Sequence, residues 1–216
     1  WIQKGGTTAF EFEPSNKYAV ALRIDNYSIP GLRLGISGYY GHSIDNSLGR
    51  EASKEANSRN LKGAVTIGTF DFTYNAHNWI VRGNFDYGHL GDANDVRLLT
   101  GRQTKTSPFN RDYVGKAAMA TGIEAGWDVF SQIQKMRQDK QKFYVFGHYE
   151  YYNSYIPTSE EPSYPYTKKN RMAFGVNYYP IPQIALKAEY SKRFLKSGYN
   201  DEPSISVGIA YEGFFL

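Results

Sequence analysis

The sequence predicts an all-β protein in which about ten antiparallel strands follow one another in up-and-down order. Three observations carry this prediction. Apolar and polar residues alternate in segments of about ten residues, which is the period of a strand with two different faces. Glycine, proline and asparagine mark the ends of these segments. Short and long connections alternate along nearly the whole chain.

The expected strands belong to a single domain over residues 1–216. Their ranges are Thr7–Phe12, Lys17–Asp25, Leu32–Gly41, Gly63–Asn75, Trp79–Tyr87, Gly115–Phe130, Lys142–Tyr152, Asn170–Tyr179, Gln183–Phe194 and Ser204–Leu216. In Trp79–Tyr87, for example, Val81 and Phe85 fall on one face, and Arg82 and Asp86 fall on the other. No stretch of useful length has helical periodicity, although Arg50–Asn60 has the composition for a helical turn or two.

Short and long connections alternate from one expected strand to the next. Short connections lie near residues 29, 76, 131 and 180, although the one at 131 is longer than a usual turn, and long polar segments begin at 43, 88, 153 and 195. β-Barrels of the bacterial outer membrane have short periplasmic turns and long extracellular loops. The sequence therefore predicts a transmembrane antiparallel β-barrel whose C-terminus lies on the periplasmic side.

Composition agrees with a barrel and excludes several other classes. The longest apolar runs are far shorter than the roughly 18 residues of a spanning helix, whereas the alternating strands of a barrel escape a hydropathy scan. The absence of cysteine excludes a disulfide framework, a zinc–thiolate site and a thiol nucleophile. The net charge is +4, but basic residues are scattered among acidic ones, so we expect no nucleic-acid partner.

The two ends of the chain bear on the same prediction. An outer-membrane protein is made with a signal peptide, and none precedes Trp1, so we expect a processed or partial chain. The last segment alternates and then stops in aromatic residues, and it resembles the assembly signal of outer-membrane barrels. The residues that carry this resemblance are Ser206, Gly208, Tyr211, Phe214 and Phe215.

The residues opposite the apolar face are rich in charge of both signs. These candidate lumen-facing residues are Arg23, Asp25, Arg33, Asp71, Arg82, Asp86, Glu124, Asp128, His148, Glu150, Arg171, Lys187, Glu189 and Glu212. In a narrow barrel such charges pair and fill the interior, and in a wide barrel they line water and set which ions pass. Because about eight strands leave room only for side chains, about ten strands are near the filled end.

Tyrosine and tryptophan gather near the ends of the expected strands, where their rings suit the headgroup level of a membrane. These residues are Tyr18, Tyr27, Tyr40, Tyr74, Trp79, Tyr87, Trp127, Tyr151, Tyr178, Tyr190 and Tyr211. The alternative is a water-soluble β-sandwich whose tyrosines pack a core.

Three segments resemble the C-terminal half of porins of the phosphate-selective O/P type found in Bacteroidetes. They are Leu32–Ser43, Trp79–Leu90 and the last two strands from Tyr178. This resemblance implies a porin-like channel for passive diffusion of small polar solutes or ions. It also implies a larger barrel of about sixteen strands, of which this chain would be the C-terminal part. The basic ladder of those porins is not reproduced here, so anion selectivity is not expected.

Enzyme chemistry finds little support in the sequence. Each of His42, His89 and His148 has a carboxylate nearby in the chain, but no Gly-x-Ser-x-Gly or His-Glu-x-x-His motif is present. We therefore expect no enzyme, no metal and no cofactor. The expected partners are outer-membrane lipid, lipopolysaccharide and the barrel-assembly machinery. A closed barrel that serves as a structural or accessory subunit of a membrane complex remains the first alternative, a barrel enzyme the second, and the oligomeric state stays open.

Overall fold

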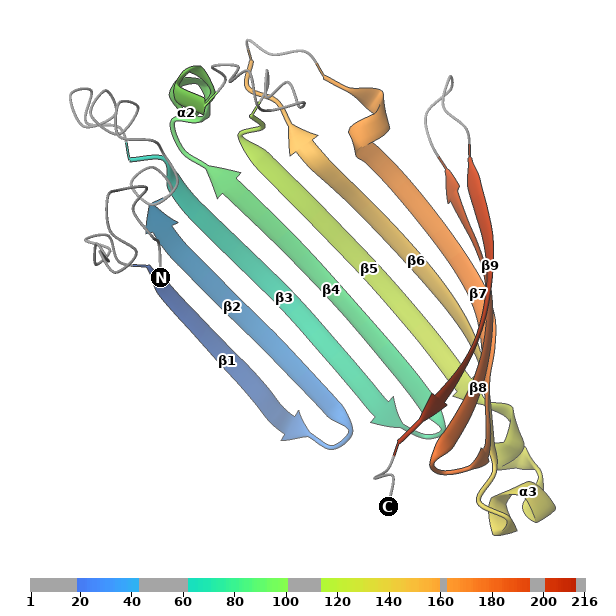
Figure 1. Ribbon diagram of the computed structural model, residues 1–216. Helices are drawn as coiled ribbons and strands as arrows, with labels where there is room; N and C mark the ends of the chain where they lie inside the picture. The colour runs from blue at the N-terminus through green and yellow to red at the C-terminus, as the bar shows by residue number, and fades with distance from the viewer. Residues whose placement is uncertain (1–18, 43–61, 101–113, 160–162, 195–200, 213–216) are drawn as a thin grey trace, which may run out of the picture.

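Nine strands form one antiparallel sheet in the computed structural model, which describes residues 19–42, 62–100, 114–159, 163–194 and 201–212 (Figure 1). They are β1 (Val20–Ile29), β2 (Leu32–His42), β3 (Ala64–Ala76), β4 (Trp79–Leu90), β5 (Ala117–Asp128), β6 (Lys142–Ile156), β7 (Lys168–Ile181), β8 (Ile184–Phe194) and β9 (Glu202–Tyr211). Each strand pairs only with its neighbours in the chain, in the order β1 to β9. The predicted all-β, up-and-down arrangement is confirmed.

The nine strands correspond to nine of the ten that the sequence predicts. The remaining one, Thr7–Phe12, lies outside the described residues, as does Arg50–Asn60. Strand ends differ from the predicted ones by a few residues, and β5 stops at Asp128 because Val129 begins a short 3-10 helix, η1 (Val129–Gln132).

The pairing register keeps aligned side chains on the same face of the sheet from β1 to β9. Irregularities occur between Asn26 and Ile29, between Ala117 and Met119, and between Tyr178 and Ile181, all close to strand ends. A slip of one residue inside a strand would move all its side chains to the opposite face. The confinement of the irregularities to strand ends therefore keeps two distinct faces across the whole sheet.

The sheet forms a single curved layer. Figure 1 shows β1 to β6 face-on and β7 to β9 turning edge-on, and no described helix covers either face. The buried apolar side chains among the described residues are all alanines, namely Ala93, Ala117, Ala173 and Ala185, and no large side chain is fully buried. The described chain thus has no hydrophobic core of the kind that two packed layers create.

The described sheet is not closed into a barrel, which differs from the barrel that the sequence predicts and from the closure by these strands alone that the accessory-subunit alternative requires. The edges are β1 and β9, and no pairing joins them among the described residues. Every successive pair is antiparallel, so the first and the ninth strand run in the same direction. Antiparallel pairing of β1 with β9 is therefore geometrically impossible, and antiparallel closure requires an odd number of further strands between them.

Short helices occupy two connections in which the sequence predicts none. Helix α2 (Ala93–Thr100) lies between β4 and β5, and α3 (Gln134–Gln138) lies between β5 and β6, at opposite ends of the strands (Figure 1). A third element, η2 (Pro165–Thr167), is a single 3-10 turn before β7. One or two turns are too short to show a helical period in the sequence. Within the described residues no helix has the length and apolar character to cross a membrane.

Tight turns join the strands at the end of the sheet that holds α3. The β3–β4 turn consists of His77 and Asn78, which both adopt positive φ, at 53° and 66°. This is the backbone of a type I′ turn, whose twist matches that of the flanking strands. The Tyr74 hydroxyl and the His77 Nδ1 lie 2.7 Å apart, so a hydrogen bond ties the turn to β3.

Replacing Asn78 by valine will destabilise the protein by about 1–2 kcal/mol, because a β-branched residue tolerates positive φ poorly. Urea unfolding in a fixed detergent measures the change. The matched control is Gln183→Val in the two-residue β7–β8 turn, where no described residue has positive φ. Equal losses from the two substitutions would contradict the assigned turn conformation.

Candidate functional site

The register divides the strand residues into two chemically different faces. Ile24 aligns with Ile36, Phe70 and Phe85 across four strands, and we name the face that they share the apolar face. The opposite surface, which holds Asp25 and the residues aligned with it, is named the polar face. The polar face contains the predicted lumen-facing residues Arg23, Asp25, Arg33, Asp71, Arg82, Asp86, Glu124, Asp128, His148, Glu150, Arg171, Lys187 and Glu189, while Glu212 follows the end of β9.

Four of these residues form a closed charged quartet on β1, β2 and β3: Arg23, Asp25, Arg33 and Asp71. The guanidinium of Arg23 donates to Asp25 at 2.7 and 2.8 Å and to Asp71 at 2.9 and 3.2 Å. That of Arg33 lies 3.0 Å from Asp25 and 2.5 Å from Asp71. Two positive and two negative charges therefore neutralise one another beside the β1 edge.

Gly35 provides the space that the charged quartet occupies. It lies on β2 between Asp25 on β1 and Asp71 on β3, directly aligned with both. A Cβ atom at this position would clash with Arg23 and lie 2.8 Å from Asp71 Oδ2 and 3.0 Å from Asp25 Oδ1. The quartet is thus folded down onto the backbone of β2, and a side chain at position 35 would lift it.

A second cluster, here named the glutamate string, runs across β5 to β8: Glu124, His148, Glu150, Arg171 and Glu189. His148 lies between two carboxylates, with Nδ1 3.9 Å from Glu124 and Nε2 3.2 Å from Glu150. Arg171 bridges Glu150 at 3.4 Å and Glu189 at 2.6 Å. With three carboxylates and one guanidinium, the string carries more negative charge than the quartet does.

The remaining predicted residues of the polar face have different roles. Asp128 accepts hydrogen bonds from the amides of Phe130 and Phe143 at 3.2 and 3.1 Å, so it organises the turn after β5. Asp86 accepts from Asn84 at 2.5 Å. Arg82 and Lys187 are exposed, and no ion pair joins either to a carboxylate in the described part of the chain.

Four further charged residues belong to the polar face and are absent from the predicted set: Lys142, Lys169, Arg193 and Glu202. Arg193 on β8 and Glu202 on β9 are directly aligned and form an ion pair. Arg193 alternates in step with Lys187 in the predicted strand, so the sequence places both on one face. Lys169 and Glu202 lie at strand ends that the sequence predicts as loops. These additions bring positive and negative charges on this face close to balance.

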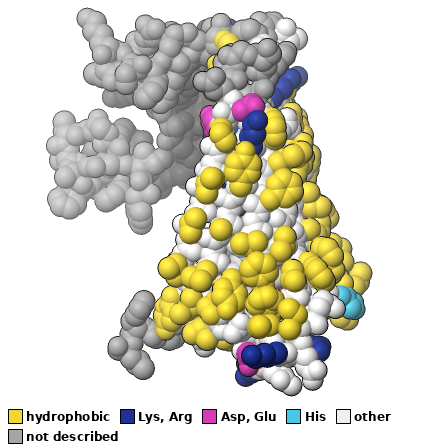
Figure 2. Space-filling model, turned by 90° about the vertical axis from the view of Figure 1, so that its right-hand side faces the viewer, with side chains coloured by type: hydrophobic (Ala, Val, Ile, Leu, Met, Phe, Trp, Pro, Cys, Tyr) yellow, Lys and Arg dark blue, Asp and Glu magenta, His cyan; other side chains and the backbone are white. Residues whose placement is uncertain are grey.

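The apolar face is covered by exposed hydrophobic side chains. Phe174 in β7 is 63% exposed and Val207 in β9 is 81% exposed. Figure 2, which views the right-hand side of Figure 1, shows hydrophobic side chains spread over this convex surface, with charged side chains confined to its two ends. Soluble monomers rarely expose apolar patches larger than a few hundred Å².

Aromatic residues of the apolar face fall into two groups, one at each end of the strands. Tyr74, Trp79, Trp127, Tyr178 and Tyr211 lie toward the end with tight turns. Tyr40, Tyr87, Tyr151 and Tyr190 lie toward the other end. Trp79 and Trp127 are neighbours across β4 and β5, with ring centroids 6.3 Å apart. Of the other predicted aromatic residues, Tyr27 is exposed beside the β1 irregularity and Tyr18 lies outside the described residues.

The predicted assembly signal lies only partly in the described chain. Ser206 and Gly208 are on the polar face of β9, and Tyr211 is on its apolar face. Phe214 and Phe215 lie outside the described residues. Every residue of β9 is exposed, and among the described strands β9 pairs only with β8.

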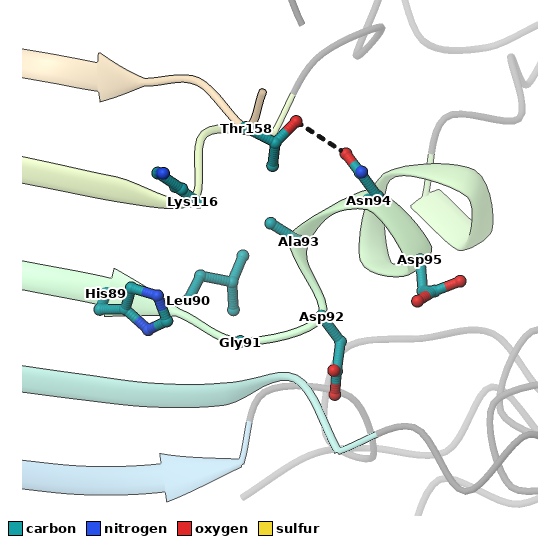
Figure 3. A pocket seen from close by; sticks show the side chains of 9 residues that line it. All are labelled: His89, Leu90, Gly91, Asp92, Ala93, Asn94, Asp95, Lys116 and Thr158. Atoms are coloured by element: carbon teal, nitrogen blue, oxygen red, sulfur yellow. Dashed lines mark hydrogen bonds between the residues drawn. The ribbon is translucent and has the colours of Figure 1, made fainter. Parts of the chain in front are cut away.

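An open pocket of about 310 Å³ lies beside α2, at the end of the sheet opposite the tight turns (Figure 3). The Thr158 hydroxyl donates to Asn94 at 3.0 Å, and Asp92 accepts from the amides of Lys62 and Gly63 at 3.4 Å. In Figure 3 the side chains of Asp92, Asn94 and Asp95 point in different directions. They do not converge on one cation, and the described residues contain no His, Asp or Glu group with metal-binding geometry.

No described histidine sits in the arrangement that hydrolysis requires. The ring of His148 lies within ion-pair distance of two carboxylates, and no serine or threonine hydroxyl of the described residues forms a hydrogen bond with it. His89 stands on β4 at the edge of the pocket, while Asp92 and Asp95 point away from it (Figure 3).

No protein-family model matches this chain, and a search of curated proteins finds no relative.

Replacing Gly35 by alanine will displace the charged quartet, whose side-chain ends the new Cβ would meet, and will lower stability by up to about 1 kcal/mol, the usual worth of exposed ion pairs. Urea unfolding measures the loss. The matched control is Gly38→Ala on the apolar face of the same strand, where the nearest atom to a new Cβ is 3.9 Å away. An unchanged stability in the Gly35→Ala variant would show that the quartet does not rest on Gly35.

Proposed function

We propose that this chain forms the wall of an outer-membrane β-barrel channel through which small polar solutes or ions diffuse passively. The observation that carries the proposal is the uncovered apolar face. Burial of apolar surface is worth about 25 cal/mol per Å², so a soluble protein would cover such a face with a second layer. Among the described residues no second layer exists. Lipid hydrocarbon is the partner that matches a broad apolar surface whose charged side chains lie only at its two ends.

The ends of the strands support this orientation in a bilayer. Two groups of aromatic residues flank the apolar face, as the girdles of outer-membrane barrels do. Three connections at the α3 end have two residues, at positions 30–31, 77–78 and 182–183. Tight turns mark the periplasmic side of such barrels. The α2 end then faces outward, toward lipopolysaccharide, and the β9 edge is the segment that the barrel-assembly machinery would engage.

The polar face becomes the lumen wall in this proposal. Its nine described strands do not close, and the common direction of β1 and β9 requires further strands for antiparallel closure. A barrel with more strands has a wider interior, and wide barrels enclose water. This favours a channel over the first alternative, a closed accessory barrel in which paired charges fill a narrow interior. The balance of signs on the polar face favours a general pore over an anion-selective one.

Substitution of Phe174 by arginine tests the lipid contact of the apolar face. An arginine facing the bilayer midplane costs about 2–4 kcal/mol in outer-membrane barrels, so folding into phospholipid vesicles should become weaker by that amount. The matched control, Asn84→Arg on the polar face, should change folding by less than about 0.5 kcal/mol. A soluble protein would tolerate an arginine at this exposed position, so a neutral result would contradict membrane contact.

The decisive experiment is single-channel recording of the purified full-length chain in a planar bilayer under a salt gradient. Discrete and reproducible conductance steps are expected, and the reversal potential reports the ion preference. Quenching of tryptophan fluorescence by brominated lipid verifies insertion in the same preparation. Insertion without conductance steps would overturn the channel and favour the closed accessory barrel.

Replacing Asp71 by asparagine leaves Arg23 and Arg33 with a single carboxylate between them. The lumen wall then gains one positive charge, which repels cations and attracts anions. The reversal potential should therefore shift toward the anion equilibrium potential. Asp139→Asn is the matched control, because it makes the same charge change in the β5–β6 connection outside the sheet. An equal shift in both variants would place Asp71 away from the ion path.

A further inference from the structure

The four connections at the α3 end of the sheet differ sharply in length. Three have two residues, whereas the connection between β5 and β6 runs over residues 129–141 and contains η1 and α3. We name residues 129–141 the basic connector. A tight turn suffices to join two antiparallel strands, so the extra length of the basic connector requires another explanation.

The basic connector is folded onto the apolar face. The Phe130 ring packs against Phe143 and Tyr178, with centroids 5.3 and 6.0 Å apart, and both partners belong to the apolar face of β6 and β7. The Ser131 hydroxyl donates to the carbonyl of Asp128 at 2.6 Å, and Asp128 caps η1. These contacts hold the segment in a defined position at the edge of the surface that we propose to contact lipid.

The basic connector presents uncompensated positive charge at this edge. Lys135, Arg137 and Lys140 are exposed, and none forms an ion pair with a carboxylate of the described residues. Asp139 is the one acidic residue between positions 129 and 141. Ile133 is 44% exposed beside these cations. Figure 2 shows basic side chains just beyond the hydrophobic surface, at the end where Figure 1 places α3.

We propose that the basic connector binds the phosphate headgroups of anionic phospholipids in the membrane leaflet on the tight-turn side. Phe130 and Ile133 would lie at the acyl boundary, and Lys135, Arg137 and Lys140 would extend to the headgroups, as basic side chains beside an apolar anchor do at interfaces. This inference rests on the proposed insertion of the sheet into a bilayer. It adds a specific lipid class and the residues that select it.

Tryptophan quenching measures this selection in the full-length chain. Trp1→Phe is introduced in every variant, so that Trp79 and Trp127 at the tight-turn end report. The protein is folded into phosphatidylcholine vesicles that contain increasing fractions of brominated phosphatidylglycerol, and separately of brominated phosphatidylcholine. Since one basic residue near an anionic surface is worth about fivefold in affinity, phosphatidylglycerol should be preferred at least about threefold. The triple substitution K135Q/R137Q/K140Q should abolish this preference, and high salt should weaken it.

The matched control is K62Q/K116Q/K168Q, which removes the same charge from exposed lysines near the opposite ends of the strands. It should retain the wild-type preference. Equal quenching by the two lipids in the wild-type protein would overturn the proposal and leave the cations for an aqueous partner such as an acidic protein. Equal loss in both triple variants would also overturn it. If neither lipid quenches, the chain is not inserted, and the proposed channel fails together with this inference.

Discussion

Continuous antiparallel hydrogen bonding from β1 to β9 is the constraint on which the rest of the structure depends. Each strand pairs only with its chain neighbours, so the parity of one strand determines which side chains share a face in all the others. Ile24 in β1 and Phe174 in β7 therefore lie on the same face although they are six strands apart. Because the irregularities in pairing sit at strand ends, the apolar and polar faces never mix, and a single layer acquires two chemically different surfaces.

The charged side chains of the polar face and the hydrophobic side chains of the apolar face are accommodated in different ways. On the polar face, the charged quartet and the glutamate string pair charges between neighbouring strands, and Gly35 allows the quartet to lie flat against the backbone. On the apolar face no described helix or strand covers the hydrophobic side chains, and the proposed function assigns that role to lipid. The proposed membrane location follows from this asymmetry, and the basic connector lies where the apolar face meets its tight-turn edge.

The edge strands β1 and β9 prevent the nine described strands from closing into an antiparallel barrel by themselves. They run in the same direction, and each pairs with only one other strand among the described residues, β1 with β2 and β9 with β8. Unpaired edges promote association with other strands, and in hydrocarbon they carry a large energetic cost. In the proposed barrel, further strands would pair with both edges, and their number would be odd because β1 and β9 run in the same direction.

The strands, the two faces and the alternation of short and long connections could be predicted from the amino-acid sequence, because side-chain period and turn residues are local properties. Val81 and Arg82 are on opposite faces in any antiparallel sheet. The sequence could not determine which charges meet. Arg23 contacts Asp71, which is far away in sequence, because the β1, β2 and β3 registers align Asp25, Gly35 and Asp71 and place Arg23 two residues along β1 from this row. Nor could it place α2, α3 or the contact of Phe130 with Tyr178, because these short elements have no period of their own. Whether the sheet closes was decided by tertiary structure alone, since curvature and strand direction accumulate over all nine strands.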